Sequence, residues 1–184
     1  MRVISGIAKG TRLETLEGNS TRPTLDRVKE ALFNIIQTNI KEANVLDLFA
    51  GSGALAIEAL SRGAKHAILC DKSNYAIKII KRNLEKTHLE ENAQIINSDY
   101  NKALNSYKDT KFDLIFIDPP YKLDIAVDAI SKIISLDLLE QDGIIVLETD
   151  NKERELEKLK NINVNVYDLR KYGRVTLIFL NRKG

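Results

Sequence analysis

Short runs of apolar residues alternate with amphipathic stretches from residue 45 onward. Runs this short and this apolar are typical of β-strands that are covered on both faces. Five strands are predicted, at Val45–Phe49, Ala67–Cys70, Gln94–Asn97, Phe112–Ile117 and Ile144–Leu147. Because helical patterns separate them, we expect a parallel, doubly wound α/β sheet, which binds its ligands at the carboxyl ends of the strands.

Three of the helices are marked by the spacing of their apolar residues or by their ends. One precedes the first strand, with apolar positions three or four residues apart from Leu25 to Ile36. A second occupies Ala54–Arg62 and ends at Gly63. A third begins after Ser73, which suits an N-cap.

The two ends of the chain depart from this alternation. Met1–Leu16, with glycines at positions 6 and 10 between short apolar stretches, predicts a β-hairpin placed before the core. Val164–Leu169 and Val175–Leu180 predict a closing antiparallel hairpin.

Length and composition limit the class of protein. A chain of 184 residues, 43% of them apolar, suits one globular domain with a substantial core. Its one cysteine excludes an intrachain disulfide, and no Cys/His pattern suggests a metal site. No apolar run approaches the roughly 18 residues that span a bilayer, and charged residues occupy the start of the chain. We therefore expect a cytoplasmic protein without a membrane segment.

Charge is distributed unevenly, although the net charge is only +2. Residues 1–29 carry six Lys/Arg and three acids, and residues 169–184 carry five Lys/Arg and no acid. The central residues 30–168 carry 17 basic and 23 acidic side chains. Two basic ends on one side of the fold would form a surface that faces phosphates. Ordinary solvated surface charge explains the same counts equally well.

The segment Asp47–Gly53, with the sequence DLFAGSG, follows a predicted strand and opens a helix. Glycines in this position let a ligand approach the backbone closely. Gly51, Gly53 and Ala56 also fit the dinucleotide pattern G-x-G-x-x-A, and an acid follows at position 71, so a nicotinamide dehydrogenase is a genuine alternative. Asp47 favours S-adenosylmethionine, because a carboxylate attracts its amine and repels a pyrophosphate. The remaining alternative is a tight turn without a ligand.

The most specific signal is Asp118-Pro119-Pro120-Tyr121, which ends a buried strand. Prolines fix the backbone, so that their carbonyl groups become rigid hydrogen-bond acceptors. Asp118 and the Pro119 carbonyl suit the two N–H groups of an exocyclic base amine, whose positive charge grows during methyl transfer. Tyr121 suits stacking on the base.

Four other residues are single candidates. Asp99, after the third strand, suits an adenine amino group, but an Asp at such a junction is commonly a turn former. Cys70 lies within an apolar strand, which favours core packing over a nucleophilic role. His66 and His88 have no neighbouring catalytic partners and are expected at the surface or at helix ends.

Together, DLFAGSG from Asp47, the acid at Asp71, the pair Ser98-Asp99 and DPPY from Asp118 resemble the class I N-methyltransferases. More narrowly, the chain is similar to the RsmD-type 16S ribosomal RNA guanine-N2 methyltransferases. The opening residues 2–6, the Arg-Pro-Thr loop at 22–24 and the Tyr-Gly pair at 172–173 extend the resemblance over the whole chain. It implies a Rossmann-like fold whose seven-stranded, mostly parallel sheet has an antiparallel C-terminal hairpin and an added N-terminal β-hairpin.

The resemblance also implies a role for each matched residue. The residues that it assigns to S-adenosylmethionine are Asp47, Phe49, Gly51, Gly53, Asp71, Asp99, Arg22 and Thr24. The residues that it assigns to catalysis are Asp118, Pro119, Pro120 and Tyr121. The residues that it assigns to RNA are Arg2, Lys9, Arg12 and Arg22. We expect one domain, 1–184, in which residues 1–20 form the RNA-facing hairpin and residues 21–184 the catalytic core.

The expected activity is methylation of the exocyclic N2 of a guanine in 16S ribosomal RNA, of the position-966 type. The expected partner is 16S ribosomal RNA or the small ribosomal subunit, and we expect a monomer without a metal ion. The alternatives are an N-methyltransferase that acts on another RNA or DNA base amine, an NAD-dependent oxidoreductase, and an RNA-binding module without catalysis. DNA adenine methyltransferases usually carry an added recognition domain, for which 184 residues leave little room.

Overall fold

A computed structural model describes residues 1–16, 23–120 and 123–183. The strands are β1 (Asn44–Asp47), β2 (His66–Asp71), β3 (Ala93–Asn97), β4 (Phe112–Ile117), β5 (Leu139–Thr149), β6 (Val164–Tyr172) and β7 (Val175–Arg182). The α-helices are α1 (Pro23–Ile35), α2 (Ala54–Ser61), α3 (Asn74–Thr87), α4 (Tyr100–Ser106), α5 (Ala126–Ser135) and α6 (Lys152–Leu159). Short 3-10 turns occur at Gln37–Asn39 and Glu90–Asn92.

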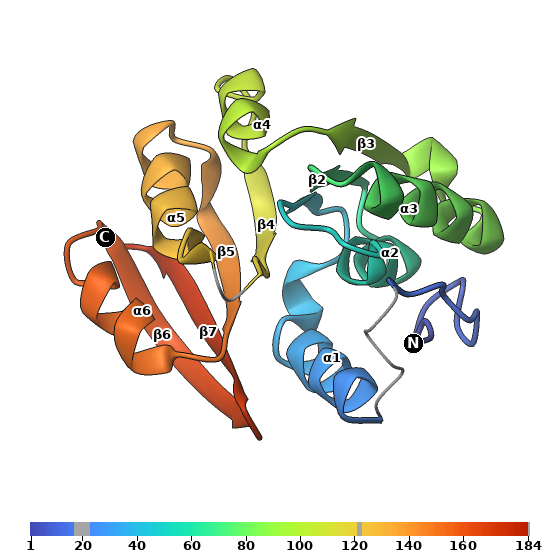
Figure 1. Cartoon of the computed structure of the whole chain (residues 1–184), viewed down its shortest axis with the longest axis horizontal. Coiled ribbons are helices and arrows are strands. Elements are labelled where there is room, and N and C mark those ends of the chain that lie inside the picture. Colours follow the sequence, from blue (N-terminus) through green and yellow to red (C-terminus); the bar gives the residue numbers. More distant parts are fainter. Residues whose placement is uncertain (17–22, 121–122, 184) are drawn as a thin grey trace.

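Within the described residues, seven strands form one sheet in the order β3-β2-β1-β4-β5-β7-β6 (Figure 1). Strands β1 to β5 are parallel, and β7 joins β5 in the antiparallel direction. The strand order reverses between β2 and β4 on either side of β1, which is the place where such sheets bind ligands. The predicted seven-stranded, mostly parallel sheet is confirmed.

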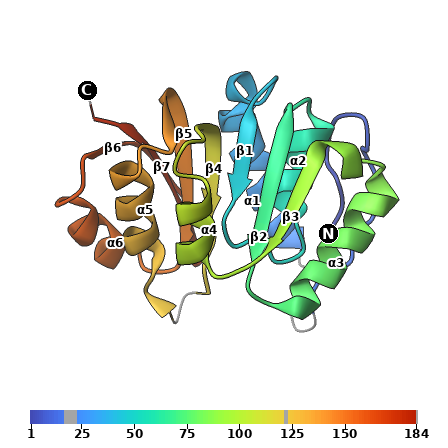
Figure 2. The ribbon, with the colours of Figure 1, turned by 90° about the horizontal axis from the view of Figure 1, so that it is seen from above.

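Two hydrophobic cores lie on opposite faces of the sheet. Figure 2 shows α1 and α2 on one face and α4 and α5 on the other. Side chains of a strand point alternately to the two faces. In β4, Leu114 and Phe116 face the core that contains α1, α2 and α3. Ile115 and Ile117 face the core that contains α4, α5 and α6. Both faces are therefore apolar, which explains why the strands are continuous hydrophobic runs in the sequence.

Strand β5 is longer than predicted. Its first residues include the polar 140–142, so the apolar pattern begins only at Ile144. Nevertheless Phe112 pairs with Leu139, and the register then shifts before Leu114 pairs with Ile144. This irregularity accommodates the polar residues at the start of the strand.

The predicted N-terminal β-hairpin is only partly formed. The segment doubles back, with N–H···O bonds from Val3 to Thr11 and from Gly10 to Val3, but its β-pairing is the single bridge Arg2–Arg12. The physical reason lies in its contact with α2. A Cβ on Gly6 would lie 1.7 Å from the Ser61 carbonyl oxygen, so the backbone approaches the helix too closely for another residue.

The predicted C-terminal hairpin is confirmed as β6 and β7, which pair from Val164–Arg182 to Tyr172–Val175. It lies at the opposite side of the sheet from the N-terminal segment (Figure 1). Because β7 runs antiparallel to β5, the turn between β6 and β7 lies at the carboxyl ends of the parallel strands. The exposed Lys171 and Arg174 flank that turn. Among the described helices, none is long and apolar enough to cross a membrane.

Candidate active site

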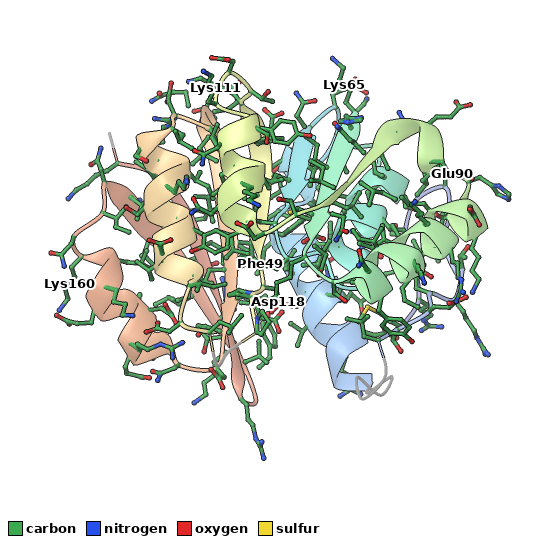
Figure 3. All side chains as sticks on the ribbon, turned by 45° about the horizontal axis from the view of Figure 1, so that its top comes forward. Phe49, Lys65, Glu90, Lys111, Asp118 and Lys160 are labelled. Atoms are coloured by element: carbon green, nitrogen blue, oxygen red, sulfur yellow. The ribbon has the colours of Figure 1, made fainter. Side chains whose placement is uncertain are left out.

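A cavity of about 680 Å³ lies at the carboxyl ends of the parallel strands. Its volume is within the range of pockets that hold cofactors and small ligands. Most of the predicted site residues that the structure describes line it: Asp47, Phe49, Gly51, Asp71, Asp99, Asp118, Pro119 and Pro120. Residues that lie 73 positions apart in the chain thus share one cavity because consecutive parallel strands end at the same edge. Figure 3 shows Phe49 and Asp118 near the middle of the molecule.

The glycine loop has the backbone that its sequence predicts. Gly51 and Gly53 have φ values of 56° and 78°, in the left-handed region that favours glycine. Gly51 lines the cavity, whereas Gly53 is the N-cap of α2. A Cβ on Gly53 would lie 2.9 Å from the Leu69 side chain of β2. Gly53 therefore allows close packing of the loop on the sheet, and Gly51 forms part of the cavity surface.

The carboxylates after β2 and β3 accept hydrogen bonds from the backbone of their own loops. Asp71 accepts from the N–H of Gly51 at 2.9 Å and from that of Ser73 at 2.8 Å. Asp99 caps α4 and accepts from the N–H of residues 101 and 102 at 3.0 and 3.1 Å. The turn-forming role considered for Asp99 is therefore real, and Asp99 also lines the cavity. Each carboxylate oxygen has two lone pairs, so both residues keep capacity for a ligand.

Asp47 is buried at the end of β1, with 1% of its surface exposed. It accepts a long hydrogen bond of 3.4 Å from the N–H of Ala56. Burial and the nearby charge of Asp71 raise the pKa of Asp47 to about 7. A cationic group that entered the cavity would stabilise its charged form.

Asp118 follows β4 and is partly exposed to the cavity. Burial raises its pKa well above the ordinary value, and the charges of Glu148 and Asp47 raise it further. The next residue, Pro119, is buried, and Pro120 is exposed. The site thus holds an electron-rich acceptor group within a fixed backbone, which suits a ligand that carries N–H donors or develops positive charge.

An aromatic pair forms another part of the cavity wall. The rings of Phe49 and Tyr100 lie 5.6 Å apart at 41°. The hydroxyl of Tyr100 donates a 2.7 Å hydrogen bond to Asp128, which is the main reason that its pKa rises to about 12. The Tyr100 ring is therefore fixed and neutral, and it supplies a flat surface with Phe49.

Comparison with known proteins agrees with this geometry. A family model described as Conserved hypothetical protein 95 matches residues 1–181. The Bacillus subtilis protein YlbH is 41% identical over 187 residues, covering 100% of both chains. Ribosomal RNA small subunit methyltransferase D of Haemophilus influenzae is 36% identical over 152 residues, covering 82% of this chain and 79% of its own.

The solved structure of the Escherichia coli protein YhhF has a TM-score of 0.86 and 31% identity, and it covers 100% of this chain and 98% of its own. The chain belongs to the RsmD-type methyltransferase family. The predicted family is confirmed, and the alternative of a nicotinamide dehydrogenase is removed.

Several of the predicted site residues are not among the residues that line the cavity. Arg22 and Tyr121 lie outside the described residues, and Thr24 is described only as part of the α1 backbone. The basic residues Arg2 and Lys9, like the predicted RNA residue at position 12, are exposed and do not line the cavity. The turn that carries Lys9 packs at the C-terminal end of α2, about 12 Å along that helix from the glycine loop.

The sequence analysis missed a buried ion pair between α1 and α2, of which Lys29 also lines the cavity. Lys29 of α1 lies 3.1 Å from Glu58 of α2, with 3% and 0% of their side chains exposed. Glu58 also accepts the N–H groups of Ile4 and Ser5 and a 2.8 Å bond from Arg62. Burial lowers the pKa of Lys29, and Glu58 opposes this shift. A signal was present for Glu58, because it is the one charge in the otherwise apolar sequence of α2.

Asn83 is a second residue that sequence reasoning missed. Its buried amide on α3 accepts the N–H of Glu14 at 2.7 Å and donates to the carbonyls of Glu14 and Ser52, both at 2.9 Å. One side chain therefore connects the N-terminal segment to the glycine loop. Next to it, the segment places Thr15 and Leu16 on the cavity wall. The N-terminal segment is thus part of the candidate site rather than an appendage.

The remaining single candidates are structural. Cys70 is fully buried and donates to the Ser98 carbonyl at 3.4 Å, and burial raises its thiol pKa to about 12. His88 is the C-cap of α3, and His66 begins β2. In the described ranges, no group of three or more His, Cys, Asp or Glu side chains is suited to a metal ion.

Proposed function

We propose that the chain transfers a methyl group from S-adenosylmethionine to the exocyclic N2 of a guanine in small-subunit ribosomal RNA. The observation that carries this proposal is that the glycine loop and Asp118-Pro119-Pro120 line the same cavity. The name of the Haemophilus influenzae relative supports the ribosomal substrate. The residue assignments below rest on the cavity and on the family pattern.

The cofactor end of this proposal lies at β1, β2 and β3. Asp71 would accept the ribose hydroxyls, Asp99 the adenine amino group, and Asp47 would face the amine of the methionine portion. The depth of Asp47 in the cavity suits an ammonium group, because a buried carboxylate is stabilised by an opposite charge. Bound S-adenosylmethionine supplies an electrophilic methyl group on a sulfonium centre.

The substrate end lies at Asp118. The lone pair of an exocyclic amine is delocalised into the base, so the amine must be held in the direction of the methyl group. Asp118 and the Pro119 carbonyl would accept its two N–H bonds and fix that direction. As the new carbon–nitrogen bond forms and the methyl–sulfur bond breaks, positive charge would grow on nitrogen, where the Asp118 carboxylate would stabilise it. The amine would then release one proton to water, which leaves a neutral methylated base beside the neutral thioether product.

The test is methyl transfer from S-[methyl-³H]adenosylmethionine to small-subunit particles and to bare 16S ribosomal RNA, both from a strain that lacks the gene. Mass analysis of the nucleosides should show N2-methylguanosine in at least one of the two. A methyl group on another base, or no transfer to either substrate, would contradict the proposal.

Asp71→Ala tests the cofactor end separately. Removal of the ribose acceptor should weaken S-adenosylmethionine binding in calorimetry by roughly tenfold, with RNA binding preserved. The matched control is Asp142→Ala, an exposed aspartate of β5. If Asp71→Ala bound the cofactor like the wild type, Asp71 would not belong to the site.

A further inference from the structure

The candidate cavity divides according to the order of the strands. The glycine loop, Asp71 and Asp99 follow β1, β2 and β3, and they occupy one side of it. The other side is formed by the ends of β4 and β5. If the cofactor lies over β1 to β3, the base must be recognised over β4 and β5. The side chains that β4 and β5 present there therefore decide which base fits.

Strand register places a second carboxylate beside Asp118. Phe116 pairs with Val146 and Ile117 with Leu147, so Asp118 and Glu148 are the next neighbours along the same two strands. Adjacent strands are about 4.8 Å apart, and the alternation along both strands sends these two side chains to the same face. Both line the cavity, and the charge of Glu148 raises the pKa of Asp118.

Two neighbouring carboxylates repel each other, which costs free energy. A ligand that carries two adjacent N–H donors offsets this cost, because each donor can bond one carboxylate. Guanine is the base with that edge, because its N1–H donor adjoins the N2 amine. Adenine and cytosine present an amine beside a ring nitrogen lone pair. A second carboxylate would face that lone pair and repel it.

We propose that Glu148 is the specificity-determining residue for guanine: its carboxylate accepts the N1–H while Asp118 accepts from the N2 amine. This inference rests on the proposed function and extends it from the amine to the neighbouring ring position. A site built to bond a donor strongly rejects an analogue that lacks it, because the site's own polar group is left unpaired.

The test compares guanine with 2-aminopurine at the methylated position of a reconstituted small-subunit particle. 2-Aminopurine keeps the N2 amine but has a lone pair at N1. The wild type should prefer guanine strongly. In Glu148→Gln the amide can donate to that lone pair, so the ratio of kcat/KM for guanine to that for 2-aminopurine should fall by about 10²-fold. 2-Aminopurine also lacks the O6 of guanine, but the wild type and Glu148→Gln lose that contact alike. The change in the kcat/KM ratio between the two proteins therefore reports residue 148 alone.

Two further variants separate recognition from structure. Glu148→Asp keeps the charge and should keep the guanine preference, although its rate falls. Glu140→Gln is the matched control, since Glu140 lies on the same strand with similar exposure at the opposite end. All three variants should bind S-adenosylmethionine like the wild type, and a loss of binding in Glu148→Gln would assign Glu148 to the cofactor and overturn the inference.

A pH profile gives a readout that a merely structural role would not change. Removal of the Glu148 charge lowers the pKa of Asp118, so the acid limb of the single-turnover rate should move to lower pH in Glu148→Gln. If Glu148→Gln left unchanged both the acid limb of the rate and the kcat/KM ratio of guanine to 2-aminopurine, the inference would be overturned. If the wild type methylated a base other than guanine, the proposed function itself would fail, and mass analysis reports that outcome independently of any variant.

Discussion

The β1–β3 side and the β4–β5 side of the cavity hold their carboxylates in opposite ways. On the first side, Asp71 and Asp99 each accept two backbone N–H groups from their own loops. On the second side, Asp118 lies beside Glu148, and burial and like charge raise its pKa. Backbone hydrogen bonds thus hold the carboxylates of Asp71 and Asp99, whereas burial and like charge disfavour the charged form of Asp118.

This difference indicates what each side contributes. We expect charges that the backbone or a buried partner satisfies to hold the loops in place, so their loss should lower stability. We expect charges that repel one another to serve binding and catalysis instead. Their loss should appear in rate or specificity, with the fold unchanged. Four predictions test this division, in order of decreasing effect.

The largest effect is expected for the buried ion pair between α1 and α2. Glu58→Ala leaves Lys29 buried without its partner and removes the acceptor for two backbone N–H groups. The free energy of unfolding should fall by about 3–5 kcal/mol, as measured in urea. Glu157→Ala, which removes an exposed partner of Lys160, is the control and should leave stability unchanged. If Glu58→Ala were as stable as the wild type, the expectation that satisfied charges stabilise the fold would be wrong.

Asp118→Ala should have the next largest effect, on rate alone. Loss of one preorganised charge-stabilising group should reduce single-turnover methylation by about 10²–10³-fold. Affinity for S-adenosylmethionine should remain nearly intact, and the melting temperature should not fall. Asp118→Asn should also be impaired, because its amide offers an oxygen without the charge. A wild-type rate in Asp118→Ala would contradict the assignment of the catalytic centre.

Asp47 lies at the end of β1, the strand next to β4, and its effect on stability should depend on pH. Its folded pKa of about 7 lies above its ordinary value of 3.8, so the folded state keeps a proton that the unfolded state has lost between those values. Stability should therefore fall as pH rises from about 4 to about 7. Asp47→Asn should melt higher than the wild type at pH 8, by a few kcal/mol in stability, and match it near pH 4. An identical difference at both pH values would show that Asp47 does not titrate in this range.

The smallest effect is expected at the surface. Reversal of Arg2, Lys9 and Arg12 to Glu should weaken RNA binding and reduce the slope of log affinity against log salt by about 2. Cofactor affinity should not change, because these side chains do not line the cavity. Reversal of three exposed lysines elsewhere, Lys108, Lys111 and Lys160, to Glu changes the net charge equally and is the control. Identical salt slopes would favour the interpretation of ordinary solvated charges.

The sequence predicted the parallel sheet well because both faces are covered, so that each strand is one apolar run. The glycine loop and the strand-end aspartates were predicted because backbone geometry limits the residues that such positions accept. The start of β5 could not be predicted, since its polar residues 140–142 pair with β4 through a register shift. No local pattern encodes pairing with a partner so distant in the chain.

Long-range contacts explain the other differences. The N-terminal segment gives several of its N–H groups to Glu58 and Ser61 of α2, which the sequence of the segment itself does not indicate. Likewise, the position of Glu148 beside Asp118 depends on the register of β5 against β4. A charge that stands alone in an apolar helix, as Glu58 does in α2, was a usable signal for a buried partner.

The burial of Cys70 has a practical consequence for spectroscopy. Its thiol is fully enclosed and, with a pKa of about 12, is almost entirely protonated at neutral pH, so a maleimide or disulfide reagent meets little reactive thiolate. A cysteine introduced at an exposed position such as Lys9 should therefore accept a fluorophore selectively, without removal of the native residue. The N-terminal segment can then be followed by fluorescence as RNA and cofactor are added to an otherwise unaltered chain.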